Sequence, residues 1–171
     1  MESTMITVEQ IKLLFNLKPL QAERGYFAET YRSHHLIPED ALPKGYEGKR
    51  ALSTAIYYLL TPDTFSALHR LPTDEIYHFY LGDPVEMLQL FPDGTGKVIT
   101  LESDIVKGMQ PQVIAMSGIW QGSRLLPGGK CALLGTTMSP EFEPADYEAG
   151  TRQALAHSYP QFRDLIHALT H

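Results

Sequence analysis

The stretch HRLPTDEIYHFYLG, residues 69–82, is the most informative part of the sequence for the fold and the site. A histidine ends one run of strand-forming residues, a Pro-Thr-Asp turn follows, and Glu75 opens the next run. Because a short turn brings the ends of two antiparallel strands together, we expect His69 and Glu75 to face each other across a hairpin. An imidazole and a carboxylate in this position can share a divalent metal ion. They can equally form a general base with the group that orients it.

The section around this stretch, residues 25–138, predicts a series of short antiparallel strands. It is rich in Tyr, Phe, Ile, Val and Thr, and Gly, Pro and Asp interrupt it about every eight to twelve residues. The Pro-Asp-Gly-Thr-Gly run at residues 92–96 is the strongest hairpin signal. The candidate strands are residues 26–33, 52–60, 65–70, 75–81, 85–91, 97–101, 112–116, 123–126 and 131–137.

Helices are expected only near the two ends of the chain. Thr7 followed by Gln10 is a capping-box pattern and predicts a helix over residues 7–16. Pro160 and the apolar stripe at residues 162, 165, 166 and 169 predict a final helix. Residues 34–50 hold several prolines and glycines and predict a long loop. We find no repeat or linker, so we expect a single domain over residues 1–171, either a closed barrel or a two-sheet jelly roll.

Composition excludes several classes of function without naming one. The 171 residues include 14 basic and 20 acidic side chains, a net charge of −6, which argues against nucleic acid as a partner. The longest apolar runs, such as residues 55–60, are far too short to span a bilayer, so we expect no membrane partner. The N-terminus has no secretory leader pattern, and the single Cys131 cannot form an internal disulfide. We therefore expect a cytoplasmic protein.

The spacing within residues 69–82 resembles the first conserved motif of the cupin superfamily, usually written G-x5-H-x-H-x(3,4)-E-x6-G. His69, Glu75 and Gly82 fall at its positions, and Gly118 within MSGIWQ (residues 116–121) is in register with the second motif, G-x5-P-x-G-x2-H-x3-N. The phrases HRL (69–71), DEIYHFY (74–80), GDP (82–84) and GTTMSPEF (135–142) are similar to those of the cupin-5 family, formerly a domain of unknown function. The resemblance runs from about residue 12 to residue 160. It implies an all-β, RmlC-like jelly-roll barrel with an N-terminal helix and short C-terminal helices packed outside.

The departures from the cupin motifs bear on the metal that the resemblance implies. Leu71 stands where the second histidine belongs and Gln121 where the last one belongs, and leucine cannot bind a metal. The remaining ligand set is His69, Glu75 and Gln121, which is weak for a transition metal. His78 is a further candidate ligand, although strand alternation from Glu75 places it on the opposite face. We therefore expect no cofactor, with a divalent metal as the alternative.

Without a metal, the same residues can carry out proton chemistry. The resemblance extends to metal-free sugar-nucleotide epimerases, which use a histidine base and a tyrosine acid. Here the base is His69 oriented by Glu75, and the acid is Tyr77 or Tyr57. We expect a small polar ligand, sugar-like or carbonyl-bearing, to be bound by His69, Glu75 and Gln121 between walls of Tyr77, Phe79 and Trp120.

Three hypotheses on function stay open at this point, and whether the protein is an enzyme is not decided. The leading hypothesis is a ligand-binding cupin that acts as a metal-free isomerase or epimerase. The second is a metal-dependent oxygenase or isomerase, and the third is a non-catalytic sensor or structural cupin whose barrel is filled by its own side chains. Arg24 and Arg32 are interpreted as solvated surface, with contact to an anionic ligand as the alternative.

The first long strand predicts assembly into a homodimer. Residues 26–31 carry large aromatic side chains and little charge at what would otherwise be an exposed edge. Such edges are blunted by charge or covered by a partner. We expect a second copy to cover this edge; the alternative is a C-terminal helix of the same chain.

Overall fold

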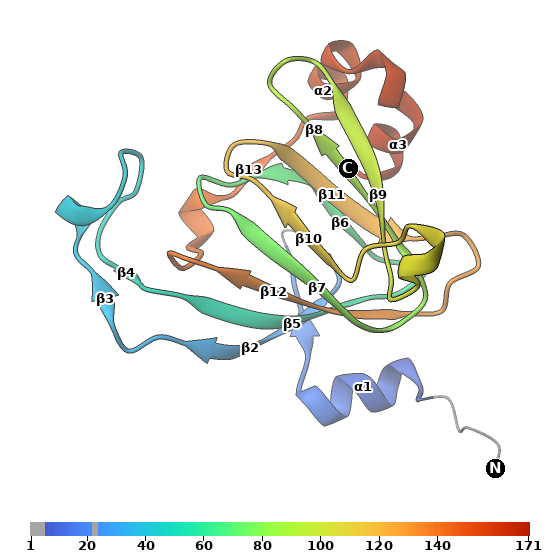
Figure 1. The fold of residues 1–171 in the computed structure, drawn as a ribbon, viewed down its shortest axis with the longest axis horizontal. Coiled ribbons are helices and arrows are strands. Elements are labelled where there is room, and N and C mark those ends of the chain that lie inside the picture. The colour runs from blue at the N-terminus through green and yellow to red at the C-terminus, as the bar shows by residue number, and fades with distance from the viewer. Residues whose placement is uncertain (1–5, 22–23) are drawn as a thin grey trace.

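The computed structural model describes residues 6–21 and 24–171, and two facing antiparallel sheets dominate it (Figure 1). The larger sheet has the strand order β1-β2-β5-β12-β7-β10, formed by Lys18–Pro19, Tyr26–Arg32, Thr54–Leu60, Ala132–Met138, Glu75–Gly82 and Gln112–Ala115. The smaller sheet has the order β13-β6-β11-β8-β9, formed by Glu148–Ala149, Phe65–Arg70, Trp120–Leu125, Val85–Leu90 and Gly96–Leu101. The chain passes repeatedly from one sheet to the other, so the expected all-β jelly roll is confirmed.

Side-chain alternation along the strands builds the core between the two sheets. Tyr58 on β5 and Tyr77 on β7 are 2% exposed and pack with Met87 and Leu134 in the interior cluster. Tyr57, one residue before Tyr58, points to the outer face of the larger sheet. Strand β5 thus places Tyr58 in the interior and its neighbour Tyr57 outside, as the two-residue period of a strand requires.

Helices cover the outer face of each sheet. Helix α1 (Val8–Phe15) begins with the expected capping box, in which Thr7 and Gln10 exchange hydrogen bonds, and its Ile11 packs on the larger sheet. Helices α2 (Arg152–Ser158) and α3 (Arg163–Ala168) pack through Leu155 and Ile166 on the outer face of the smaller sheet (Figure 1). No helix in the two described segments is long and apolar enough to cross a membrane.

Some boundaries differ from those expected. Strand β11 begins at Trp120, three residues before the expected start, because the turn at Gly118 (φ 79°) already returns the chain to the sheet. Within residues 34–50, β3 (Leu36–Ile37) pairs with β4 (Arg50–Ala51), and a short 3₁₀ helix η1 (Glu39–Ala41) lies between them. The final helix is divided into η4 (Pro160–Phe162) and α3. Two further 3₁₀ turns are η2 (Ile105–Lys107) and η3 (Pro144–Asp146).

Candidate functional site

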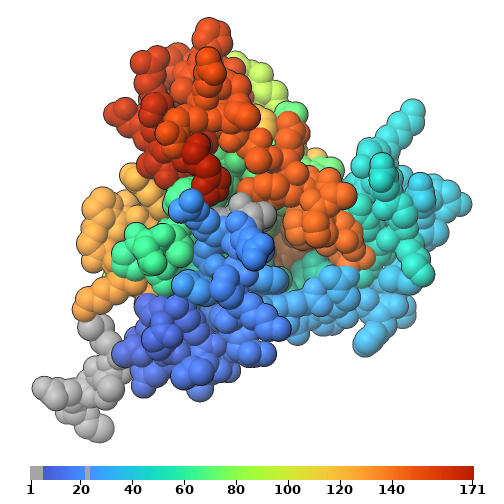
Figure 2. Space-filling model, turned by 180° about the vertical axis from the view of Figure 1, so that it is seen from behind, coloured from blue at the N-terminus to red at the C-terminus, as the bar shows by residue number. Residues whose placement is uncertain are grey.

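A cavity of about 320 Å³ opens at one end of the two-sheet core. Its walls come from β2, β5, β7 and β12 of the larger sheet and from residues 142–144, which lead from β12 towards β13. In the space-filling view, a hollow lies between the blue residues of β2 and the orange segment that precedes α2 (Figure 2). Seven of the fifteen described lining residues are apolar: Leu20, Phe27, Ile56, Leu71, Met138, Phe142 and Pro144. Its polar members are Glu29, Arg32, Thr54, Tyr58, Glu75, Tyr77, Thr136 and Glu143.

Glu75 is the buried carboxylate of this cavity. It opens β7, is 6% exposed, and lies on the same strand face as Tyr77 because the two are two residues apart. The Tyr77 hydroxyl and the Gln121 amide nitrogen both donate to Glu75 Oε2, each at 3.0 Å. Two donors on one oxygen complement an ionised carboxylate. The structure thus brings together Glu75, Tyr77 and Gln121 from β7 and β11.

His69 lies beside this group but does not line the cavity. It is fully buried on β6, directly opposite Gln121 in the strand register, and its ring stacks on Tyr147 with 4.9 Å between centroids. The backbone oxygen of Ala67 lies 2.7 Å from Nδ1, and since a carbonyl only accepts, Nδ1 carries the proton. Burial lowers the pKa of His69, opposed by the nearby Glu75 charge, so the ring is neutral near pH 7. Nε2 is buried and has no hydrogen-bond partner among the described residues.

Three other predicted site residues lie away from the cavity. Trp120 packs with the C-terminal helices on the outer face of the smaller sheet, with the Arg70 guanidinium 4.7 Å from its ring centroid. Because Gln121 points inward, the alternation of β11 sends Trp120 outward. Phe79 packs against the interior cluster and is not among the described residues that line the cavity. His78 lies on the outer face, 3.3 Å from the Thr137 hydroxyl.

Arg32 is exposed, as expected for a surface residue, with 44% of its side chain accessible, and it also lines the cavity. Its guanidinium makes a two-bond contact with Glu29, from Nε at 3.0 Å and from Nη2 at 2.8 Å, and also pairs with Glu141 through Nη1. The hydrogen bonds to Glu29 raise the pKa of Arg32. The charge-rich run EFEP at residues 141–144 was the available signal, but sequence reasoning gave no reason to bring it next to β2.

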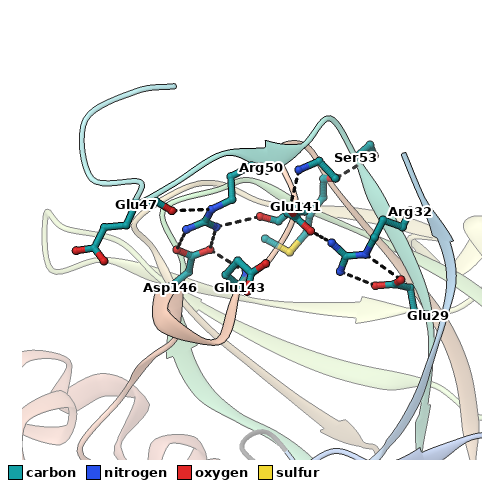
Figure 3. A network of polar contacts seen from close by, with 10 residues as sticks. Glu29, Arg32, Glu47, Arg50, Ser53, Glu141, Glu143 and Asp146 are labelled. Carbon is teal, nitrogen blue, oxygen red and sulfur yellow. Dashed lines mark hydrogen bonds and ion pairs between the residues drawn. The ribbon is translucent and has the colours of Figure 1, made fainter. Parts of the chain in front are cut away.

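A second guanidinium, that of Arg50, holds in place the segment at the mouth of the cavity, residues 142–144 (Figure 3). Arg50 is 2% exposed and donates to both carboxylate oxygens of Asp146, at 2.6 and 3.0 Å. The backbone nitrogen of Glu143 donates to the same Asp146 side chain at 3.0 Å. The Arg50–Asp146 pair therefore fixes η3, and with it the three cavity-lining residues 142–144, against β4.

The donor set does not fit the metal that the cupin resemblance implies. Within residues 6–21 and 24–171, no group of three or more His, Cys, Asp or Glu side chains could hold a metal ion. His69 and Glu75 provide one imidazole and one carboxylate, and Leu71 occupies the wall where a second histidine would stand. Gln121 is occupied as a donor to Glu75, which leaves a single amide oxygen as the third ligand. Such a set is poor for a first-row transition metal.

The interior is open, contrary to the filled barrel that a purely structural protein predicts. The cavity volume lies at the lower end of the range for small-molecule sites, and a few polar groups converge between apolar walls. This arrangement can bind a small organic molecule and can transfer protons between it and the Glu75–Tyr77 pair.

Comparison with known proteins places the chain among uncharacterised relatives. A family model described as "Cupin superfamily (DUF985)" matches residues 9–150. The uncharacterized protein YML079W of Saccharomyces cerevisiae is 32% identical over 110 residues, which are 61% of this chain and 55% of that protein. The match thus spans about half the length of this curated relative.

Solved structures show the same fold. Protein SO0799 of Shewanella oneidensis superposes with a TM-score of 0.84 at 27% identity, covering 98% of this chain and 99% of its own. A hypothetical protein from Leishmania major gives 0.85 at 26% identity, covering 97% and 99%. Oxalate decarboxylase of Bacillus subtilis gives 0.51 at 13% identity, covering 88% of this chain and 36% of the enzyme, a likeness of fold alone.

Proposed function

Because this chain belongs to the cupin-5 family of the cupin superfamily (DUF985), we propose that it binds a small polar molecule in the cavity between its sheets. The observation that carries the proposal is the cavity of about 320 Å³, in which the hydrogen-bonded Glu75 and Tyr77 share the wall with seven apolar side chains. Apolar walls pack against a carbon skeleton, and a few polar groups fix its orientation. A sugar-like or carbonyl-bearing molecule has both parts.

The reaction we propose for this site is a metal-free isomerisation or epimerisation. The Glu75 carboxylate takes a proton from the carbon next to a ligand carbonyl, while the Tyr77 hydroxyl gives its proton to the carbonyl oxygen, which yields a neutral enol. With a hydroxyl on the carbon that lost the proton, Glu75 then returns its proton to the former carbonyl carbon, and that hydroxyl gives its proton to the Tyr77 oxygen. This completes an isomerisation with no net change in atoms, and both residues regain their starting forms. His69, which does not line the cavity, acts behind Glu75 as a positioning residue.

A thermal-shift screen with sugars, sugar acids, amino sugars and small hydroxy-ketones tests binding. A ligand at a hundredfold excess over its Kd stabilises the folded state by about 2.7 kcal/mol. For a chain of this length, that raises Tm by on the order of 5–10 °C. If no compound in the panel raises Tm, the proposed function is wrong.

Two tyrosine variants locate the site within the molecule. Tyr77→Phe removes a hydroxyl that donates to Glu75 in the cavity, so we expect the ligand-induced shift to fall sharply. Tyr57→Phe is the matched control, since Tyr57 contacts Phe15 on the outer face with 4.6 Å between ring centroids. An equal ligand-induced shift in both variants would place binding elsewhere.

The metal-dependent alternative is separated from this proposal by metal analysis. Protein purified without added metal is analysed for Fe, Mn, Ni and Zn, beside the Glu75→Ala variant. Near-stoichiometric metal that disappears in the variant would favour the metal-dependent enzyme. Trace metal that is equal in both proteins is expected for the site described here.

A further inference from the structure

The charges at the cavity are unbalanced. Among the described residues, four charged side chains line it, and three of them are carboxylates: Glu29, Glu75 and Glu143. The only guanidinium in the described part of the wall, that of Arg32, is already held by Glu29 and by Glu141. Glu141 is itself buried and accepts the backbone N–H of Ala51 at 2.6 Å, so its side chain is fixed where it meets Arg32.

The other cation at the mouth of the cavity, Arg50, is likewise paired with a protein carboxylate. Arg50 donates to Asp146 with both terminal nitrogens and to the backbone oxygens of Glu47 and Glu141 at 3.4 Å, and its guanidinium lies 5.3 Å from the Tyr46 ring centroid. Figure 3 shows both guanidinium groups turned towards protein carboxylates. Two guanidinium groups thus face five carboxylates, those of Glu29, Glu75, Glu141, Glu143 and Asp146, a formal excess of three negative charges.

A separate observation concerns the atoms behind Glu75. His69 Nε2 and Gln121 Oε1 are both buried and lack a hydrogen-bond partner within the described chain. His69 carries its proton on Nδ1, so Nε2 accepts, and the Gln121 nitrogen donates to Glu75, so its other atom is the carbonyl oxygen. Both atoms are therefore acceptors, and each needs a donor.

We infer that the ligand of this cavity carries a positively charged hydrogen-bond donor, of which a primary ammonium group is the simplest, directed at Glu75. This inference rests on the proposed function and specifies its class of ligand. An ammonium brings three donors and one positive charge to a cavity whose described wall holds more carboxylates than cations. Low-dielectric walls strengthen this attraction. The buried acceptor atoms of His69 and Gln121 lie behind Glu75 and not in the cavity wall, and their lone pairs add to the negative potential at this carboxylate.

The same argument disfavours anionic ligands. A phosphate or carboxylate group needs an uncommitted arginine, lysine or cluster of N–H donors, and the described wall offers only the doubly paired Arg32. Sugar nucleotides, whose diphosphate is anionic, are therefore poor candidates for this cavity.

The test uses three probes with the same ring: glucosamine, glucose and glucuronate, measured by calorimetry and thermal shift at about pH 6.5, where the amine is charged. We expect glucosamine to bind about tenfold or more tightly than glucose, and glucuronate to bind most weakly. Glu143→Gln removes one carboxylate at the mouth, so it should reduce the preference for the amine several-fold. Glu39→Gln is the control, because it removes the same charge from the exposed η1, outside the cavity.

The outcomes separate the two proposals. Equal or tighter binding of glucose or glucuronate overturns the cationic ligand and leaves the proposed function standing. No binding by these probes or by any compound of the wider panel overturns both. An equal loss of preference in Glu143→Gln and Glu39→Gln would show a long-range effect of net charge, and it would likewise overturn the inference. Glu143 is half-buried at the mouth, so its variant tests the idea without disturbing the buried Glu75.

Discussion

His69 shows how the barrel interior sets the properties of a single side chain. The strand register places it opposite Gln121, the Ala67 carbonyl fixes its tautomer, and full burial lowers its pKa. A histidine whose folded pKa is lowered takes up a proton more readily in the unfolded chain. Unfolding is therefore favoured increasingly as the pH falls below the unfolded pKa of about 6.5.

We expect His69→Asn to weaken the acid sensitivity of the protein. Asparagine does not titrate, and its amide nitrogen can donate to Ala67 as Nδ1 does. Between about pH 6.5 and the lowered folded pKa, the free energy of unfolding of the native chain should fall by up to about 1.4 kcal/mol per pH unit more than that of the variant. Urea unfolding at half-unit pH steps measures both slopes, with the exposed His34→Gln as control. Parallel slopes for the native chain and His69→Asn would contradict the expectation.

For residues on regular strands, the sequence was enough to predict on which face of the sheet each side chain lies. Glu75 and Tyr77 were found because alternation from one strand start gives the face of each side chain. Trp120 was misplaced because its strand start was set at residue 123 instead of 120, so its alternation relative to Gln121 was not applied. The place of Arg32 in the cavity wall was missed because its partner Glu141 is about 110 positions away in sequence, and only the tertiary structure brings the two together.

Among the elements, the junction of β7 and β12 depends on a glycine. Gly82 ends β7 with φ +108° opposite Ala132, and a Cβ atom there would lie 2.3 Å from the backbone oxygen of Cys131. A side chain at this position meets a disfavoured backbone conformation and also a neighbouring strand that cannot move without breaking its ladder. Both effects act on the strand pair that carries Glu75.

Two alanine substitutions separate these effects. Gly94 in the β8–β9 hairpin also has a positive φ, +85°, but nothing lies within 4 Å of its Cβ position. We expect Gly94→Ala to cost about 1 kcal/mol from backbone strain alone. Gly82→Ala should cost about 3 kcal/mol or more, because overpacking against backbone adds to the strain. Urea denaturation gives both values, and similar losses in the two variants would refute the role of close packing.

Element prediction succeeded where turn chemistry punctuates the chain. The Pro-Asp-Gly-Thr-Gly turn and the capping box at Thr7 both act through local contacts, so they are visible in sequence. The pairing of β3 with β4 across residues 34–50 was not predicted, because two-residue strands leave no periodic pattern. Arg50 on β4 also pairs with Asp146, which is remote in sequence and gives no local signal.

At the scale of the whole molecule, β2 leaves most of its outer edge without a partner strand in the described fold. β1 pairs only with Tyr26 and Phe27, and the described C-terminal helices pack on the other sheet. Tyr31 on this edge is 55% exposed. Unpaired edges of this kind add strands from another copy. We propose a homodimer joined through the two β2 edges, in which each copy supplies the same surface.

Light scattering at micromolar concentration tests this assembly. We expect a mass of twice the 19.2 kDa of one chain. Tyr31→Asp places a charge at the edge and should shift the protein towards the monomer, because a buried unpaired charge opposes pairing. Val106→Asp, at a side chain 93% exposed on η2, is the matched control. A native mass of one chain, or equal masses for both variants, would refute the β2 dimer.

Residues 142–144, at the mouth of the cavity, offer a place where this fold can change its ligand. Residues 142–144 shape the entrance to the cavity, yet they belong to a connection whose position depends chiefly on Arg50 and Asp146. Connections tolerate substitution better than strands, since little of the core depends on them. Gene duplicates can therefore exchange this short stretch and admit different molecules while the barrel stays intact. For directed evolution, a library at Phe142, Glu143 and Pro144 with Arg50 and Asp146 kept constant would explore new ligands at low risk of unfolding.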